Sequence, residues 1–274
     1  LIFKRPMFVS VQGRLEVGIT GIIENAFDRI ITKHVYEKFL KRIICVSNSL
    51  KERLTQLKIK KSKLVMIPNG VDTNEFIRIP HSTFLDKYID GKKDYKRVVF
   101  VGRLDFQKGV EYLIRAIPTV ISKHEKVHFF ILGNGNLEIT LKKLAKELKI
   151  QNYITFLDFI PLEKMPDFYS SADIFCLPSL HEGFPLSIAE SLSIGLIIVA
   201  SAIEGVPEAI KEGYNGFLAK PGNVMDLSAK LLKALNLNEE KIKVIQNNNI
   251  ELSRAKYSWE KIIREIVKVY RLSS

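Results

Sequence analysis

Two glutamates separated by seven residues, Glu182 and Glu190, are the side chains of this sequence best placed to do chemistry. The apolar run Ile174–Leu177 comes just before them, so Glu182 is expected beyond the carboxyl end of a strand, where open α/β sheets bind ligands. A Gly-Phe-Pro turn then leads into a predicted helix over residues 185–192, whose first-turn amides could hold a phosphate. Glu190 falls more than one turn into that helix, where a carboxylate suits sugar or ribose hydroxyls better than phosphate.

Two cations follow an earlier strand-like run. Arg103 and Lys108 come after Val98–Val101 and before the next predicted helix, which places both at the carboxyl edge of the same sheet. Charge-assisted hydrogen bonds contribute roughly 1.5 to 3 kcal/mol each. The pair therefore suits a diphosphate and would stabilise a departing nucleoside diphosphate. Two exposed cations that cap a loop are the alternative interpretation.

A glycine pair separated by one residue, Gly133-Asn134-Gly135, follows a third strand-like run. Glycines give the backbone room for a close ligand. A dinucleotide fingerprint would need another glycine three residues after Gly135, but Glu138 stands there. Its charge argues against a nicotinamide or flavin oxidoreductase. A tight turn that binds no ligand is the alternative.

Metal and thiol chemistry have little support. The sequence has no Asp-x-Asp motif and five scattered histidines, so no divalent-metal site is expected. His181, beside Glu182, is read as a structural histidine or as part of the site. Cys45 and Cys176 each end an apolar run, which predicts buried free thiols in a reducing compartment.

The net charge of +12 predicts attraction to polyanions, with solubility alone as the competing interpretation. The lysine cluster at residues 58–63 lacks the interleaved aromatic residues of a single-strand nucleic-acid site, so nucleic acid is not an expected partner. The longest apolar run, residues 196–203, is far shorter than the roughly 20 residues of a membrane span. We expect a cytoplasmic protein, with peripheral contact at the anionic inner face of the membrane as a further hypothesis.

A doubly wound α/β sheet would bring these residues to one edge. From residue 97 on, short apolar runs alternate with helical patterns, as in a parallel sheet covered on both faces. The expected strands are 98–101, 127–132, 153–156, 174–177, 197–200 and 216–219, and the expected helices are 110–122, 137–148, 162–170, 185–193, 206–211 and 224–234.

The first 70 residues show the same alternation with too few strands for a complete domain. We expect strands at 7–11, 42–46 and 63–67, and helices at 22–39 and 50–57. A last helix at 259–272, after a polar segment at 246–249, is expected to pack back on the amino-terminal part. The predicted organisation is a partial amino-terminal Rossmann-like domain (1–75), a linker (76–95), a complete parallel-sheet domain (96–255) and a carboxyl-terminal helix (256–274).

Several motifs in a fixed order make nearly the whole chain similar to a known family. They are Val101-Gly102-Arg103-Leu104 with Gln107-Lys108-Gly109, Leu132-Gly133-Asn134-Gly135, Pro178-Ser179 with Glu182 to Glu190, and Gly205-Val206-Pro207-Glu208. Upstream, Cys45-Val46-Ser47-Asn48-Ser49 and Ile67-Pro68-Asn69-Gly70-Val71-Asp72 complete the set. Together they resemble the family-four retaining glycosyltransferases of the GT-B fold.

The resemblance implies a role for each motif position. Arg103 and Lys108 would bind the diphosphate of a nucleotide sugar, Glu182 the donor sugar and Glu190 the ribose. The rest of the donor site would comprise the backbone of Gly183, Phe184, Pro185 and Leu186 around the sugar and phosphate, Gly133, Asn134 and Gly135, and the backbone near Ile160 at the base. Fixed cations and helix amides would take the charge that develops on the leaving phosphate in place of a metal.

The resemblance therefore implies a metal-independent, retaining hexosyltransferase that uses a nucleoside diphosphate sugar and no cofactor. The acceptor is expected to be a glycan or a lipid-linked molecule. A non-catalytic nucleotide-sugar-binding fragment, a nucleotide-sugar epimerase of GT-B architecture and a glycosyl phosphorylase are the alternatives, although no pyridoxal lysine is identifiable for the last. The amino-terminal half is expected to be truncated, and Gln12 stands where the family often has a histidine.

Overall fold

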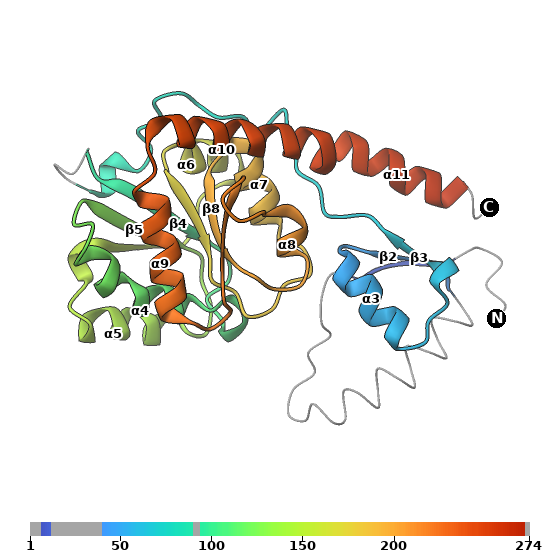
Figure 1. The fold of residues 1–274 in the computed structure, drawn as a ribbon, viewed down its shortest axis with the longest axis horizontal. Coiled ribbons are helices and arrows are strands. Elements are labelled where there is room, and N and C mark those ends of the chain that lie inside the picture. The colour runs from blue at the N-terminus through green and yellow to red at the C-terminus, as the bar shows by residue number, and fades with distance from the viewer. Residues whose placement is uncertain (1–6, 12–39, 90–93, 272–274) are drawn as a thin grey trace.

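Two α/β units, each built on a parallel sheet, make up the part of the chain that the structure describes (Figure 1). This computed structural model describes residues 7–11, 40–89 and 94–271. The larger unit contains a six-stranded sheet and the smaller unit a three-stranded one, which confirms the predicted GT-B-like fold class. The helix predicted at 22–39 and the position of Gln12 lie outside the described residues.

The strands of the larger unit run in the order β6-β5-β4-β7-β8-β9. The chain moves from β4 outward through β5 and β6, then crosses back to β7 and moves outward through β8 and β9. Ligands of doubly wound sheets bind at the carboxyl ends of the strands where the order reverses, here between β4 and β7. Each strand lies within two residues of its predicted place: β4 Lys96–Val101, β5 Val127–Leu132, β6 Ile154–Leu157, β7 Ile174–Leu177, β8 Ile197–Ser201 and β9 Gly216–Ala219.

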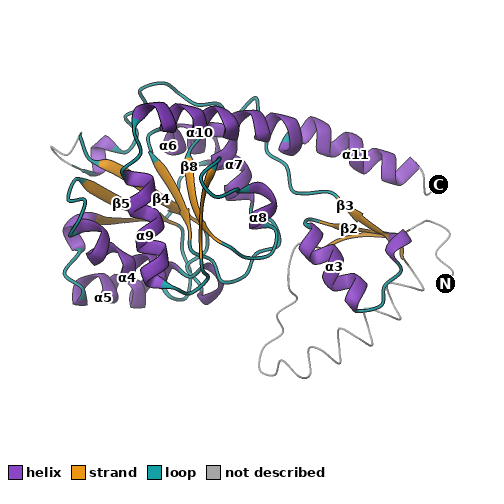
Figure 2. Ribbon diagram, viewed as in Figure 1, coloured by secondary structure: helices purple, strands orange, loops and turns teal. Residues whose placement is uncertain are grey.

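Helices enclose this sheet, and β5, β7 and β8 are buried along their whole length (Figure 2). Strands covered on both faces need apolar side chains pointing both ways, which explains their continuous apolar runs. Helix α4 lies between α5 and α9, and α7 contacts both α6 and α10. The helices are α4 Val110–Ile121, α5 Glu138–Glu147, α6 Met165–Ser170, α7 Leu186–Ile194, α8 Val206–Ala209, α9 Val224–Leu235 and α10 Glu239–Leu252.

Helix α10 corrects the sequence analysis, which expected a polar segment at residues 246–249 and no helix between those at 224–234 and 259–272. The buried side chain of Asn249 donates to the carbonyl oxygens of Leu196, at 2.7 Å, and Asn215, at 3.0 Å. Asparagine has a weak helix propensity, so these tertiary hydrogen bonds override a local preference that the sequence pattern weighs alone. A π-helical turn, Ser253–Tyr257, follows α10.

The smaller unit contains three parallel strands in the order β1-β2-β3 and one described helix. Helix α11, which begins directly after the larger unit, runs across to this small sheet (Figure 1). There its Ile262 and Val269 pack against Ile44 and Ile67. The elements are β1 Met7–Val11, β2 Leu40–Cys45, α3 Asn48–Gln56, β3 Leu64–Met66 and α11 Trp259–Arg271.

The two chain segments that connect the units lie side by side. The amide of Val71 donates to the Tyr257 carbonyl at 2.8 Å, and the amide of Trp259 donates to the Val71 carbonyl at 3.0 Å. These hydrogen bonds join the end of the smaller unit to the start of α11. The domain boundaries given above stay predictions.

Both cysteines are free and buried, as the sequence predicts. Burial raises the pKa of Cys45 to about 11, and it raises the pKa of Cys176 further. Within the ranges that the structure describes, no helix combines the length and the apolar composition needed to cross a bilayer.

Candidate functional site

The first acid of the motif and one of the two predicted cations meet where the strand order reverses. Lys108 Nζ lies 2.6 Å from Glu182 Oε1, and their side chains are 18% and 10% exposed. Ser179 Oγ donates to the same carboxylate oxygen at 2.8 Å. Among the described residues no group donates to Glu182 Oε2, so this oxygen can accept a hydrogen bond from a ligand hydroxyl.

Local backbone structure sets the position of both partners. Lys108 ends a 3₁₀ turn, Phe106–Lys108, that follows β4, and the Asp105 side chain caps this turn by accepting from the Lys108 amide at 3.1 Å. Glu182 lies in the loop after β7. The Leu180 amide of that loop donates to the Gln107 carbonyl at 2.7 Å, so the two loops are held together by their backbones.

Arg103 lies on the same loop as Lys108 but in a different environment. Its side chain is 72% exposed, and its Nη2 lies 2.9 Å from Asp105 Oδ2. Exposed ion pairs of this kind contribute about 0 to 1 kcal/mol, so Arg103 can exchange Asp105 for a phosphate at little cost. In the described part of the chain, no hydrogen bond or ion pair joins Arg103 to the Lys108–Glu182 pair.

The glycine turn at residues 133–135 packs against the loop that contains the cations. The Asn134 carbonyl accepts from the Leu104 amide at 2.8 Å. A Cβ atom at Gly133 would lie 2.0 Å from the Gly102 oxygen, and one at Gly135 would lie 2.3 Å from the Leu104 oxygen. This close backbone packing requires both glycines whether or not a ligand binds. Donor binding by this turn stays a prediction.

The second acid of the motif, Glu190 of α7, is held by a buried tyrosine that the sequence analysis missed. Tyr169 Oη of α6 donates to Glu190 Oε2 at 2.7 Å. Burial raises the pKa of Glu190, and the hydrogen bond from Tyr169 partly opposes that rise. Burial, with the Glu190 charge nearby, also raises the pKa of Tyr169, so the phenol stays protonated as the donor.

We expect the Glu190→Gln variant to be more stable than the wild type at pH 7, by about 2 °C in Tm. The raised pKa means that the folded chain holds the Glu190 proton to a higher pH than the unfolded chain does. Its contribution to stability is therefore present at low pH and is lost as the pH rises through the folded pKa. Glutamine still accepts from Tyr169 and has no charge to desolvate. In thermal melts from pH 4 to pH 8, the difference in Tm between Glu190→Gln and the wild type should increase with pH. The control Glu163→Gln, at an exposed position, should melt like the wild type at each pH.

The residues after Glu182 form the entry of α7. Gly183, Phe184 and Pro185 are buried, and Leu186 in the first turn is 51% exposed. Pro185 precedes α7 without a side-chain cap, which leaves first-turn amides for an anion. Ile160, beyond β6, is 7% exposed. Binding of the base by its backbone stays a prediction.

Two further residues outside the predicted set hold Phe184. Its ring stacks on Tyr257, with ring centroids 4.8 Å apart and planes at 19°. Its carbonyl accepts from Asn69 Nδ2 of the smaller unit at 2.7 Å. Asn69 belongs to the upstream motif Ile67 to Asp72, so the family resemblance includes this segment. It did not predict the hydrogen bond from Asn69 to Phe184.

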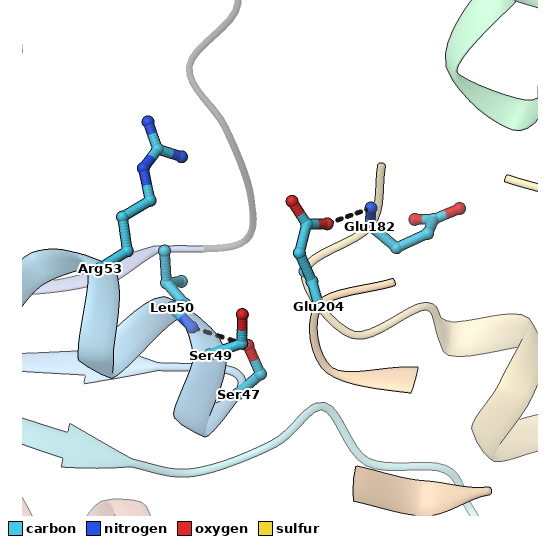
Figure 3. Close-up of a pocket in the computed structure, with 7 residues that line it drawn as sticks. Ser47, Ser49, Leu50, Arg53, Glu182 and Glu204 are labelled. Atoms are coloured by element: carbon cyan, nitrogen blue, oxygen red, sulfur yellow. Dashed lines mark hydrogen bonds between the residues drawn. The ribbon is translucent and has the colours of Figure 1, made fainter. Parts of the chain in front are cut away.

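A small cavity lies beside Glu182, between the two units (Figure 3). Its lining consists of Ser47, Ser49, Leu50 and Arg53 from the smaller unit and Glu182, Gly183 and Glu204 from the larger unit. The side chain of His181, the residue before Glu182, is 37% exposed, and its Nδ1 lies 3.7 Å from Glu204 Oε1. In the described part of the chain, no group of three or more His, Cys, Asp or Glu side chains is placed to hold a metal ion.

The fold and this arrangement place the chain in a defined family. The sequence matches the family model of glycosyl transferases group 1 over residues 84–251, and that of glycosyltransferase family 4 over residues 12–75. The chain belongs to the glycosyl transferases group 1 family. The family match includes Arg103, Lys108, Glu182 and Glu190.

Individual relatives agree with this assignment. An uncharacterized glycosyltransferase of Methanocaldococcus jannaschii is 31% identical over 85% of this chain and 60% of its own length. The GPI3 subunit of phosphatidylinositol N-acetylglucosaminyltransferase of Saccharomyces cerevisiae is 30% identical over 84% of this chain and 50% of its own. The chain thus spans about half to 60% of these relatives. Anabaena HepE, solved in complex with UDP-glucose, shares the fold at a TM-score of 0.85 and 20% identity, covering 97% of this chain and 72% of HepE.

Proposed function

We propose that this chain transfers a hexose from a nucleoside diphosphate sugar to an acceptor, with retention at the anomeric carbon and without a metal. The observation that supports this most is the Lys108–Glu182 ion pair at the switch point of the sheet, near the start of α7. The GPI3 relative is named as an N-acetylglucosaminyltransferase, and HepE was solved with UDP-glucose. Both support a nucleotide-sugar donor.

Each residue then has a distinct role. Lys108, Arg103 and the first amides of α7 stabilise the negative charge that develops on the departing diphosphate, because preorganised cations and dipoles act most strongly in a partly buried site. The free oxygen of Glu182 accepts hydroxyls of the donor sugar, and Glu190 accepts those of the ribose. The cations supply the positive charge that a metal ion supplies in other transferases. Retention follows the family resemblance.

Incubation with UDP-, GDP- and ADP-linked glucose and N-acetylglucosamine, together with simple glycosides whose hydroxyl groups can accept the sugar, tests this proposal when it is read by proton NMR with and without EDTA. The expected result is release of one nucleoside diphosphate and formation of a product with the donor's anomeric configuration, unchanged by EDTA. Inverted product contradicts retention, and loss of activity in EDTA contradicts metal independence. Binding without turnover supports the non-catalytic alternative, and an altered sugar on the nucleotide supports an epimerase.

We further propose that the acceptor is presented at an anionic membrane surface, which α11 contacts. The helix exposes Trp259, Ile263 and Val267, at 40%, 53% and 40%, along one stripe. Exposed basic residues continue around the helix beside this stripe, at Lys268 and Arg271. Apolar and basic stripes side by side are typical of helices that lie on anionic membranes.

Charge reversal of Lys268 and Arg271 to glutamate is expected to reduce binding to anionic vesicles at least about 30-fold, since each basic residue near the surface contributes about 1 kcal/mol and each 1.4 kcal/mol corresponds to a factor of ten. Co-sedimentation with vesicles of neutral or anionic phospholipid measures this. Lys143→Glu with Lys146→Glu, on the exposed face of α5, makes the same change in net charge and should have a much smaller effect. Equal recovery of the wild type with neutral and anionic vesicles would remove the proposal.

A further inference from the structure

The motif Gly205-Val206-Pro207-Glu208 places a carboxylate of the larger unit on a helix of the smaller unit. Glu208 Oε2 accepts from the Asn48 amide at 3.0 Å and from Asn48 Nδ2 at 2.8 Å. Its Oε1 accepts from the Ser49 amide at 3.1 Å. The start of a helix leaves amides unpaired and favours negative charge. Helix α3 has no acidic residue in its own first turn, so Glu208 supplies that charge from across the interface.

A second carboxylate of the same segment holds the loop that contains the donor-site acid. Glu204 Oε2 accepts from the backbone amide of Glu182 (Figure 3). Glu204 is not a glycine, yet it has a φ of +36°, in the left-handed region. Such a backbone conformation persists only where its surroundings hold it, and it occurs often at functional sites. The residue in this strained conformation is thus the one whose side chain accepts from the Glu182 amide.

Gly205, between the two carboxylates, is in contact with both partners. A Cβ atom there would lie 2.4 Å from the Gly183 oxygen and 2.8 Å from Ser47 Cβ. Gly183 follows Glu182 in the loop, and Ser47 is the N-cap of α3. At Gly205 this segment therefore packs directly between Ser47 of the smaller unit and the Glu182 loop, without room there for a methyl group.

We propose that residues 204–208 couple the position of the smaller unit to the geometry of the Glu182 loop, with Glu204 and Glu208 as positioning residues. This inference rests on the proposed function only in taking Glu182 as the group that binds the donor sugar. Loss of the Glu208 contact loosens the attachment of α3 to the larger unit, and with it the packing of Ser47 against Gly205. The part of the site that binds the sugar is then less ordered, whereas the loop that positions Lys108 is unchanged.

Comparison of two ligands tests this coupling. Glu208→Ala is expected to weaken binding of the nucleoside diphosphate sugar about tenfold, and to leave binding of the nucleoside diphosphate alone within about twofold. Glu208→Gln keeps one acceptor oxygen but loses the charge and turns a donating amide group toward Asn48 or Ser49, so it should recover only part of the difference. Glu204→Gly should show the same selective loss and, because it removes the left-handed strain, should keep or raise Tm. Glu212→Ala is the matched control, since Glu212 accepts the Leu218 amide at 2.8 Å within the larger unit alone.

A measurement without ligand separates this inference from the proposed function. Spin labels on cysteines introduced at the exposed positions Gln56 of α3 and Met225 of α9 report the distance between the units. The two native cysteines are buried and so do not compete for the label. Glu208→Ala should broaden the distance distribution and Glu208→Gln should broaden it less, whereas Glu212→Ala should keep the wild-type one. An unchanged distribution in Glu208→Ala, or equal loss of both ligands, overturns the coupling. A wild type that binds no nucleotide sugar, with the distribution broadened as expected, overturns the proposed function and leaves the interdomain contact standing.

Discussion

Replacing Glu182 with glutamine is expected to lower the rate of sugar transfer at least about 100-fold, while the chain keeps its fold and its Tm within about 3 °C. Glutamine has the shape of glutamate and still accepts from Ser179, whose hydroxyl donates to Glu182 at 2.8 Å. It removes the negative charge that orients Lys108 and accepts the sugar hydroxyls. Release of nucleoside diphosphate from the donor, followed with time, measures the effect.

The matched control is the Glu138–Lys142 pair on α5. Its Nζ to oxygen distance is also 2.6 Å, but the two side chains are 27% and 45% exposed and lie one helical turn apart. Glu138→Gln should leave the transfer rate unchanged. Equal activity of the Glu182→Gln variant and the wild type would show that the acid of the motif takes no part in transfer.

Replacing Lys108 with glutamine is expected to weaken nucleoside diphosphate binding about 10- to 100-fold. A charge-assisted hydrogen bond to phosphate contributes about 1.5 to 3 kcal/mol, and each 1.4 kcal/mol corresponds to a factor of ten. Lys108→Arg keeps the charge and should recover part of the affinity. Arg103→Gln should have a smaller effect, because the Arg103 side chain is 72% exposed and screened by solvent.

Isothermal titration of UDP, GDP and ADP measures these affinities, and Lys142→Gln on α5 is the control for the loss of one positive charge. The wild type should prefer one of the three nucleotides. Wild-type affinity in Lys108→Gln would place the diphosphate elsewhere. The residues that recognise the base would then also belong to a different site.

The strands of the larger unit could be predicted from the sequence because apolar runs bounded by turn residues have few alternative structures. β5 and β7 coincide with their predictions. Helix α10 could not be predicted in this way, because the hydrogen bonds of Asn249 reach Leu196 and Asn215, which lie just before β8 and β9 and are distant along the chain. Local sequence patterns take account of the weak helix propensity of asparagine but not of its tertiary hydrogen bonds.

Part of the candidate site could likewise be predicted from the sequence, and part of it could not. A shared sheet edge was predictable for Lys108 and Glu182, since each follows a strand of one parallel sheet. Their contact, between residues 74 positions apart, depends on how two loops pack. Tyr169 and Glu204 belong to no recognised motif, and only their packing reveals them. The ligand roles of all these residues stay predictions.

Amide hydrogen–deuterium exchange, with and without the preferred nucleoside diphosphate sugar, tests the central claim most directly, because it needs no substitution. The proposed site predicts slower exchange in three segments that are separate in sequence: the loop at 102–109, the glycine turn at 133–135 and the Glu182 loop with the start of α7 at 182–188. Protection confined to other segments, or no protection at saturating ligand, would contradict a nucleotide-sugar site at the junction of β4 and β7.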